Sequence, residues 1–353
     1  MDGLDCCYAD INISKKNDLK FKIINYQTIP FNTNIKKNIS KVIGSDKKEL
    51  IINCHNELGI TFLNIVKKFI GKNNIELISM HGQTISHTNQ VKTLQIGSPE
   101  YLYEYYKVPI AYDFRTRDIE LGGNGAPLIP YLDWLLSKKI DKNILTLNLG
   151  GIANIAYVPS DSNRNEVIGF DTGPGMCLID QYVQQHWNLN FDSNGDLARK
   201  GKIDFKLVEK LLNHPYLSKD IPKSTSTEEF DMTYLNTLIG KYKSVNKYNV
   251  LRTLVYFTAY CIYSSSKLLE DLNNDFILII NGGGTYNSLL IEDIKKEFNL
   301  IEIYTSDFFG IHGDIKEAFL MAVMGFARYN KQYNNMPSVT GAKKYASYGK
   351  IYE

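Results

Sequence analysis

The amino-acid sequence predicts an α/β fold, and three observations carry this prediction. Apolar runs that are typical of strands are repeatedly followed by segments with helical periodicity. Several of the expected strands end in turns that combine glycine with polar residues, and open α/β sheets hold their ligands at such strand ends. The two halves of the chain also share one plan, strands first and then alternating helices and strands, so we expect two domains.

The first domain is expected to cover residues 1–128. Its expected elements are, in order, two strands within 6–30, a helix near 47–70, strands at 75–80 and 93–96, a helix at 98–106 and a strand at 108–114. The helix at 98–106 begins with Ser98-Pro99-Glu100, which supplies a cap, a first-position proline and a first-turn acid.

The second domain is expected to cover residues 129–353, after a helix near 126–137 that joins the two series. The tail from Asn334 onward has weak periodicity and could pack back on the first domain. A cleft between the domains would be the default place for a ligand. The expected elements are a strand at 145–149 with a hairpin partner at 152–158, a strand ending near 168, a helix at 176–187, a polar and mostly helical surface segment at 188–246, a helix near 249–272, a strand at 276–280, a helix from about 287, a strand at 301–304 and a helix at 314–329.

The composition argues against several classes of function. The formal net charge of the 353 residues is +2, which leaves no electrostatic footprint for nucleic acid or a membrane surface, so a small-molecule partner is expected. The longest apolar runs fall far short of the roughly 18 residues of a membrane span, and the acidic N-terminus is unlike a signal peptide. The five cysteines match neither a disulfide framework nor a zinc site, which favours a reduced cytoplasmic protein.

The stretch Gly169–Gly175 reads Gly-Phe-Asp-Thr-Gly-Pro-Gly and is the most informative of the glycine-rich turns. It is expected to place one carboxylate, Asp171, at the end of a strand, beside glycines that let backbone N–H groups approach an anion. Asp-Thr-Gly is also a common turn sequence, so a purely structural role stays open. Four further turns of this kind, none matching the P-loop or the dinucleotide fingerprint, lie at 81–84, 121–127, 148–151 and 281–284.

These turns and several other short motifs give the chain a resemblance to a known family. It resembles the anhydro-N-acetylmuramic acid kinases, a bacterial family with the actin-like, ribonuclease H-like fold of sugar kinases. The resemblance implies a two-lobed α/β kinase with a cleft between its domains. The motifs that carry it are Met1–Asp5, His81–Thr84, Leu94–Gly97, Ala111 with Asp113–Arg115 and Arg117-Asp118, Gly122-Gly123 with Gly125–Leu128, Leu147–Asn154, Gly169–Gly175, Asn281–Gly284, Gly313-Asp314 with Glu317-Ala318, and Pro337–Ala342.

The resemblance implies a coupled reaction that serves cell-wall (peptidoglycan) recycling. The family opens the 1,6-anhydro bridge of 1,6-anhydro-N-acetylmuramate with water and phosphorylates O6 from ATP, which gives N-acetylmuramate 6-phosphate. Water is a poor nucleophile, and a carboxylate within hydrogen-bond reach can take its proton. Asp171 occupies the family position of this base. The phosphoryl transfer itself depends on positioning and on charge neutralisation by Mg²⁺ and cationic groups.

The same resemblance assigns binding roles to further residues. Arginine offers a planar fork that suits the lactyl carboxylate of the substrate, and the substrate-binding candidates are Gln95, Arg115, Arg117 and Gly173. The candidates for Mg²⁺ are Asp2 and Glu317, the latter three residues beyond Asp314 and on the same face of an expected helix. The candidates for ATP are Met1, Asp2, Gly3, Leu4, Asp5, Asn148, Gly150, Gly151, Asn281, Gly282, Gly283 and Gly284.

Simpler interpretations remain open for several of these residues. Arg115 or Arg117 could form a surface ion pair with Asp118, and His81 could be a structural histidine. Glu317 could belong to an ordinary solvated acidic pair. The chain could also be a kinase of the same fold for another sugar or small acid, or an inactive nucleotide-binding homologue. The resemblance further suggests a homodimer.

The sequence departs from the family pattern at its start. In the family, a strand and a Gly-Thr-Ser turn precede Met-Asp-Gly, whereas the sequence given begins at that methionine. The first N-terminal strand and the first phosphate turn are therefore expected to be missing from it, and the loss of an internal strand would leave backbone groups unpaired. A start codon assigned too late and a truncated, defective homologue are the two explanations.

Overall fold

The computed structural model describes residues 3–240, 246–269, 275–299 and 303–353, and it confirms the predicted α/β class. The chain forms two compact units. Unit 1 contains residues 3–139, 163–165 and 314–353, and unit 2 contains the described parts of Ile140–Ser162 and Glu166–Gly313.

Unit 1 is built, in its described part, on three small sheets. β1 and β2 form one antiparallel hairpin, β4 and β5 form another, and the third sheet has the order β12–β6–β3. In this third sheet β3 runs parallel to β6 and β12 runs antiparallel to it. The strands are β1 (Gly3–Ile13), β2 (Leu19–Pro30), β3 (Ile78–Ser79), β4 (Gln83–Thr88), β5 (Lys92–Ile96), β6 (Ile110–Tyr112) and β12 (Lys350–Tyr352).

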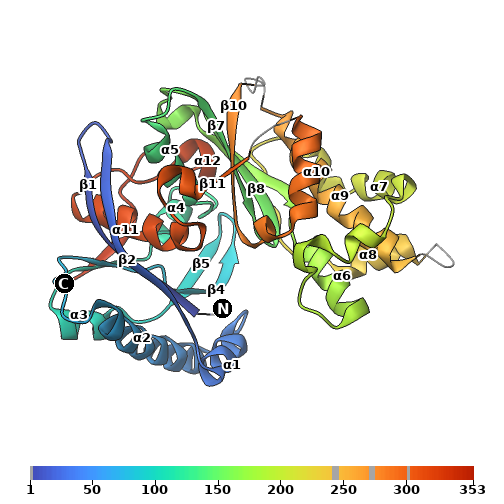
Figure 1. Ribbon diagram of the computed structural model, residues 1–353. Coiled ribbons are helices and arrows are strands. Elements are labelled where there is room, and N and C mark those ends of the chain that lie inside the picture. The colour runs from blue at the N-terminus through green and yellow to red at the C-terminus, as the bar shows by residue number, and fades with distance from the viewer. Residues whose placement is uncertain (1–2, 241–245, 270–274, 300–302) are drawn as a thin grey trace. The chain divides into compact units, whose positions relative to one another are not determined.

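The helices of unit 1 include one that the sequence reading missed, α1. The side chain of Asn32 accepts a hydrogen bond from the backbone of Ile35 at its start, and Ile35, Ile39 and Val42 form its buried face at helical spacing. α1 packs beside the long helix α2 (Figure 1). The helices are α1 (Thr33–Val42), α2 (Lys48–Ile70), α3 (Glu100–Tyr106), α4 (Thr116–Glu120), α5 (Ile129–Ser137), α11 (Lys316–Tyr329) and α12 (Pro337–Thr340).

The two units do not divide at the boundary between residues 128 and 129 that the sequence predicted. Helix α5 and residues 314–353 belong to unit 1. The physical reason is packing between distant parts of the chain, because α11 packs against β1, β3 and α5, while β12 extends the sheet beside β6. Periodicity in the sequence reports local structure and carries no signal for such contacts.

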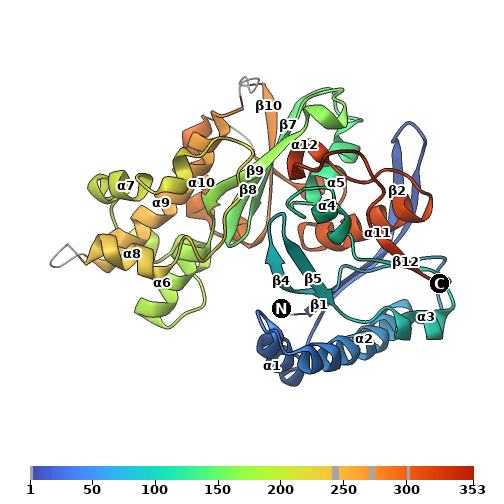
Figure 2. The same cartoon turned by 180° about the vertical axis from the view of Figure 1, so that it is seen from behind.

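Unit 2 is organised around a five-stranded sheet with the order β11–β10–β7–β8–β9. β10 is parallel to both of its neighbours. β7, β8 and β9 are antiparallel neighbours and lie in the sheet in the same order as in the sequence (Figure 2). The strands are β7 (Asn143–Leu149), β8 (Ile152–Val158), β9 (Ile168–Pro174), β10 (Phe276–Asn281) and β11 (Tyr304–Thr305).

Helices α9 and α10 lie side by side in unit 2 (Figure 1), and α9 also contacts β8 and β9. Leu254, Val255 and Ile262 of α9 are buried together with Leu145 and Leu147 of β7 in one core. The helices of this unit are α6 (Cys177–Trp187), α7 (Phe205–Leu212), α8 (Met232–Ile239), α9 (Lys247–Ser266) and α10 (Ser288–Phe298).

Candidate active site

Asp171 lies inside strand β9 of unit 2 and not in a turn after a strand. β9 is an edge strand, and Asp171 pairs with Asn154 of β8. The register shifts between Ala153 and Asn154, and Gly173 takes a φ of 137°, a value that favours glycine. The strand prediction was therefore wrong here, because pairing with β8 carries the strand through the glycine-rich stretch and absorbs its irregular backbone.

The backbone at Asp171 is fixed from the side that β8 does not cover. Its N–H donates to the carbonyl oxygen of Lys223 at 3.2 Å. Its carbonyl oxygen accepts from the hydroxyl of Tyr216 at 2.6 Å. The carboxyl Oδ2 accepts from the backbone N–H of Thr225 at 3.0 Å. Both the position of this residue and the direction of its carboxyl are thus set by protein contacts.

The environment of the Asp171 carboxyl changes its acidity in two opposing ways. Burial raises its pKa, because the charged form loses solvation, and this is the larger effect. Hydrogen bonds from the Thr225 backbone and the Ser224 side chain lower the pKa, because they stabilise the ionised form. The net result is a pKa above the ordinary value, and a carboxylate of this kind is a better proton acceptor than an exposed one.

Two of the predicted ATP-binding turns start side by side in unit 2. Asn148 and Asn281 are paired residues in the parallel strands β7 and β10, and a glycine turn follows each strand. A Cβ atom added to Gly282 would lie 2.7 Å from the carbonyl oxygen of Leu149. Gly282 also has a φ of 88°. Only glycine therefore fits where these two turns meet.

The turn at Gly150 packs just as closely against the residues that follow β9. A Cβ atom on Gly175 would lie 2.3 Å from the carbonyl oxygen of Gly150, and that oxygen accepts from the backbone N–H of Met176 at 2.8 Å. Three glycine-rich stretches thus form one backbone cluster. It brings together the candidates Asn148, Gly150, Gly151, Asn281, Gly282, Gly283 and Gly284.

The outer side of this cluster is open. Gly151 and Gly283 are exposed, and a Cβ atom on Gly283 would have nothing within 4 Å. Glycine is therefore not required at Gly283 by packing within the chain. Exposed backbone without side chains is what a phosphate or a ribose needs in order to lie against the protein.

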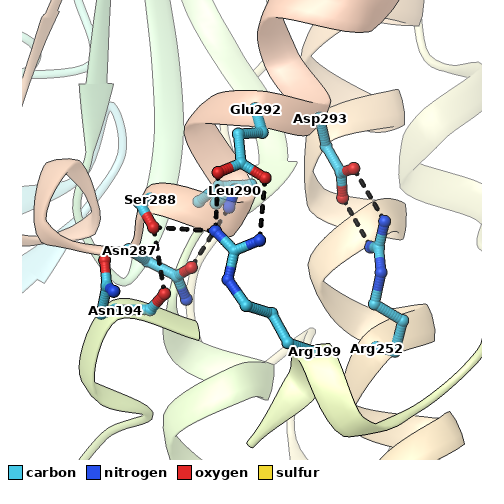
Figure 3. A network of polar contacts seen from close by, with 8 residues as sticks. All are labelled: Asn194, Arg199, Arg252, Asn287, Ser288, Leu290, Glu292 and Asp293. Atoms are coloured by element: carbon cyan, nitrogen blue, oxygen red, sulfur yellow. Dashed lines mark hydrogen bonds and ion pairs between the residues drawn. The ribbon is translucent and has the colours of Figure 1, made fainter. Parts of the chain in front are cut away.

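Helix α10, which follows the turn after β10, is anchored by a polar network within unit 2 (Figure 3). Arg199 donates to both carboxylate oxygens of Glu292, at 2.7 and 2.9 Å, and to the Ser288 hydroxyl at 2.9 Å. Arg252 forms a second two-pronged pair with Asp293, at 2.6 and 2.8 Å. These charge-assisted contacts fix helix α10, which follows the Asn281–Gly284 turn in the chain.

Arg115 belongs to unit 1 and is held at two of its nitrogens. Its Nε donates to His81 Nε2 at 2.8 Å, and its Nη1 donates to the carbonyl oxygen of Gly125 at 2.7 Å. His81 Nδ1 lies 2.8 Å from the Gly82 carbonyl oxygen, which can only accept, so Nδ1 carries the hydrogen and Nε2 accepts. Burial and the Arg115 charge lower the pKa of His81 to about 4, in agreement with a neutral ring.

The charge of Arg115 faces acidic groups. Burial lowers its pKa, while Glu317 and Asp118 act in the opposite direction. The guanidinium is therefore desolvated, oriented and close enough to Glu317 to feel its charge. The surface ion pair with Asp118 considered from the sequence does not describe Arg115, and its neighbour Arg117 forms a surface ion pair with Glu120 instead of Asp118.

Arg117 and Gln95 have simpler surroundings. Arg117 pairs with Glu120 at 2.7 Å, and both side chains are about half exposed. The Gln95 amide donates to the hydroxyl of Thr84 across the β4–β5 hairpin at 3.1 Å, and to the hydroxyl of Thr93 on its own strand at 2.7 Å. The Gln95 amide is therefore held in place on β5, whereas Arg117 forms a solvent-exposed ion pair on α4.

Asp118 connects distant parts of unit 1. Its Oδ2 accepts from the backbone N–H of Gly125 at 2.6 Å, and its Oδ1 accepts from the hydroxyls of Thr340 and Tyr348. Asp118 is fully buried. It therefore holds the loop that carries the Gly125 carbonyl, the acceptor of Arg115, against the C-terminal segment of the chain.

The structure describes only some of the predicted ATP and Mg²⁺ residues at the start of the chain. Met1 and Asp2 lie outside the described residues. Gly3, Leu4 and Asp5 begin β1, and Asp5 accepts a hydrogen bond from the Thr28 hydroxyl at 2.6 Å. Glu317 lies in the first turn of α11. Among the described residues, no group of three or more His, Cys, Asp or Glu side chains is arranged to hold a metal ion.

The sequence reading missed the residues that hold Asp171. Tyr216, Lys223, Ser224 and Thr225 all fall in 188–246, which was expected to be a polar, surface-exposed segment. Lys223 is only 6% exposed. A lysine in a polar stretch gives no signal for burial, and contacts with a strand about fifty residues earlier leave no local pattern.

The backbone cluster and the partly buried carboxyl of unit 2 are features of an α/β enzyme that handles an anionic ligand, and comparison with known proteins narrows this class. A family model described as anhydro-N-acetylmuramic acid kinase matches residues 1–353. The chain belongs to this family, which confirms the resemblance seen in the sequence.

Several curated relatives carry the same name. A protein of Clostridioides difficile (strain 630) is 38% identical over 366 residues, with 99% of this chain and 95% of the relative covered. A protein of Francisella tularensis subsp. novicida (strain U112) is 36% identical, with the same coverage of both chains. Both are named anhydro-N-acetylmuramic acid kinase. The chain is accordingly a kinase, that is, a phosphotransferase.

Among solved structures, the chain aligns with two more distant proteins. One is the activator of the 2-hydroxyisocaproyl-CoA dehydratase from Clostridium difficile with bound ADPNP, at a TM-score of 0.42 and 12% identity, covering 92% of this chain and 96% of that one. The other is a putative N-acetylmannosamine kinase from Listeria monocytogenes, at 0.37 and 14%, covering 88% and 92%. No helix in the described ranges has the length and apolarity to cross a bilayer.

Proposed function

We propose that this chain opens the 1,6-anhydro bridge of 1,6-anhydro-N-acetylmuramate with water and phosphorylates O6 from ATP, yielding N-acetylmuramate 6-phosphate for peptidoglycan recycling. Membership of the family favours this reaction over a kinase for another sugar and over an inactive homologue. The observation that carries the mechanism is the partly buried, oriented carboxyl of Asp171, with its raised pKa.

Asp171 is the general base in this proposal. Its carboxylate takes a proton from water as the water attacks the anomeric carbon, and the bond from that carbon to O6 breaks. Two protein donors keep the carboxylate ionised, while burial keeps it basic. O6 is then the acceptor of the γ-phosphoryl group.

ATP would lie against the backbone cluster of unit 2. The candidates are Asn148, Gly150 and Gly151 for the phosphates and Asn281–Gly284 for the nucleoside, and the exposed backbone at Gly151 and Gly283 fits this role. Mg²⁺, when bound, supplies charge neutralisation for the transferred group. Asp2 and Glu317 are the proposed residues for it, with Gly3, Leu4 and Asp5 beside the phosphates.

Arg115 would bind the carboxylate of the substrate, supported by Gln95, Arg117 and Gly173. Two of the Arg115 nitrogens are occupied by protein acceptors, which leaves the guanidinium fixed in direction with further donors for a ligand. We also propose a cytoplasmic location and a homodimer, and light scattering of the purified protein tests the latter.

The test of this function is product identity. The protein, ATP and Mg²⁺ are incubated with 1,6-anhydro-N-acetylmuramate or with plain hexoses, and products are identified by mass spectrometry in ¹⁸O-labelled water. The proposal expects a phosphorylated sugar that contains one ¹⁸O at the anomeric carbon. Equal turnover of a plain hexose, or a product without the label, contradicts it.

A further inference from the structure

The segment Lys223–Glu229 makes several contacts with Asp171, and the proposed function gives this segment no role. The Lys223 carbonyl accepts from the Asp171 N–H, and the Thr225 N–H donates to the Asp171 carboxyl. The Ser224 side chain between them also hydrogen-bonds to this carboxyl. Three successive residues of the segment thus contact one residue of β9.

The N-terminal end of the segment is anchored by a buried lysine, Lys223. Lys223 is buried, its ammonium donates to the Leu217 carbonyl at 3.3 Å, and it faces the rings of Tyr216 and Phe170 at 5.2 and 5.9 Å. Tyr216 in turn donates to the Asp171 carbonyl. The segment therefore begins from a fixed point beside β9.

The C-terminal end of the segment is held by polar contacts between its own residues. The Thr225 hydroxyl donates to Glu229 Oε2 at 2.7 Å, and the Glu229 N–H donates to the Ser226 carbonyl at 3.2 Å. Phe230, which follows, stacks on His214 with ring centroids 4.3 Å apart. These contacts fold the segment into a compact turn.

The segment also reaches the proposed phosphate turn. A Cβ atom added to Gly151 would lie 3.1 Å from Thr227 Cγ2, so Thr227 lies directly against that glycine. One short stretch of chain therefore contacts both the proposed base and the proposed phosphate-binding backbone.

We propose that the segment Lys223–Glu229 is the positioning element of the base, and that Ser224, together with the Thr225 N–H that bonds the carboxyl at 3.0 Å, is a positioning residue that holds the Asp171 carboxylate in one direction. The Thr225–Glu229 contact holds the Thr225 N–H in place for the same purpose. This inference rests on the proposed function of Asp171 and adds the residues through which the protein sets its acidity.

The charged and titratable groups around Asp171 leave Ser224 a distinct role. Lys223, Tyr216, Glu229 and Cys261 lie on the neighbouring elements, and the Asp171 charge raises the pKa of Tyr216. Burial raises the Asp171 pKa, and hydrogen bonds from the Thr225 backbone and the Ser224 side chain lower it. Ser224 is the one side chain among these donors, so it can be removed by substitution.

The test is Ser224→Ala, read by the pH profile of kcat/KM. Loss of a hydrogen bond to the ionised form raises the carboxyl pKa, so the acidic limb should move up by about one pH unit, which is a loss of about tenfold below the limb. Above the limb the rate should stay within about twofold of the parent. Ser224→Thr, which keeps the hydroxyl, should restore the parent profile.

Ser218→Ala is the matched control, since Ser218 is an exposed serine of the same region whose hydroxyl bonds to the Pro215 carbonyl. A second measurement needs no activity. The Asp171 carboxyl is titrated by ¹³C NMR in the ligand-free protein and assigned by its loss in Asp171→Asn. Its pKa should rise in Ser224→Ala and stay unchanged in Ser218→Ala.

These measurements separate the two proposals. A parent protein that fails to phosphorylate the anhydro sugar, with an Asp171 pKa that still responds to Ser224→Ala, contradicts the function and supports the positioning element. An active parent whose acidic limb and carboxyl pKa are the same in Ser224→Ala overturns the positioning element. Thr225→Val, which removes an exposed contact, should shift both readings in the same direction by a smaller amount, and no shift in either variant overturns the proposal.

Discussion

Two partly or fully buried aspartates, one in each unit, show how different surroundings suit a carboxylate to different work. Asp118 in unit 1 is fully buried and accepts from Gly125, Thr340 and Tyr348, two of which lie more than 200 residues away in the chain. Asp171 in unit 2 is only partly buried, and its donors come from one short segment. A saturated and inaccessible carboxylate joins parts of the fold, whereas an accessible one with a raised pKa can exchange a proton.

The sharpest way to break this comparison is to neutralise Asp171. Asp171→Asn keeps the shape and removes the base, so kcat should fall by about 10³-fold or more, within the range that general-base catalysis supplies. The free energy of unfolding should stay near the parent value or rise, because a partly buried charge is removed. Steady-state kinetics and urea unfolding measure the two. A kcat near that of the parent would show that Asp171 is a structural residue like Asp118.

The matching change in unit 1 should act on stability. Asp118→Asn places an amide where two hydroxyls and an N–H all donate, so at least one donor loses its acceptor. We expect the free energy of unfolding to fall by about 2–4 kcal/mol. Urea unfolding measures it, with Asp10→Asn on the exposed part of β1 as the control. A change below that of the control would remove the contrast between the two aspartates.

The two arginines sharpen the comparison within unit 1. Arg115→Lys loses the fork that serves His81 and Gly125 together, so KM for the sugar should rise by about tenfold or more while kcat changes less. Arg117→Lys should have a smaller effect, because its partner is an exposed glutamate. Substrate titrations of both variants test the order, and an Arg117 effect that exceeds the Arg115 effect would reverse the assignment.

A further expected effect is on pH-dependent stability. His81 has a pKa of about 4 in the folded protein and an ordinary value of 6.5. Between these values the unfolded chain binds a proton that the folded protein does not, so the free energy of unfolding falls as the pH drops from 6.5 towards 4. The slope is about 1.4 kcal/mol per pH unit for one such group.

His81→Gln isolates this contribution, since other histidines with lowered pKa values, such as His55 and His87, remain in the variant. Urea unfolding at several pH values should give a shallower acid slope for His81→Gln than for the parent protein. Equal slopes would mean that His81 is protonated in the folded state, which would exclude the Nε2 acceptor role towards Arg115.

The sequence predicted what local patterns determine. Apolar runs located β7, β8 and β10, and glycines after β7 and β10 marked the backbone cluster. The same reasoning predicted that the strand ends before Asp171, because the sequence does not show that β8 pairs with a glycine-rich stretch. The long helix α2 was predicted because its periodicity extends over many turns, whereas the shorter α1 was missed despite its Asn32 cap.

What the sequence could not supply were contacts between distant residues. The hydrogen bond from Tyr348 to Asp118 spans 230 positions, and the one from Thr225 to Asp171 spans 54. Each depends on packing of whole elements, which side-chain periodicity does not encode. The identity of the proposed base was therefore accessible from a motif, while the residues that orient it were visible only in three dimensions.

The interlocked glycine turns of unit 2 have a consequence for protein engineering. Because Gly175 closes on the carbonyl of Gly150, and Gly282 on that of Leu149, the three turns cannot be exchanged one at a time. A loop transplanted singly from another nucleotide-binding protein would bring a side chain or a shifted carbonyl into its neighbours. If these turns bind ATP as we propose, redirecting the protein to another phosphate donor would require grafting the three turns as one block.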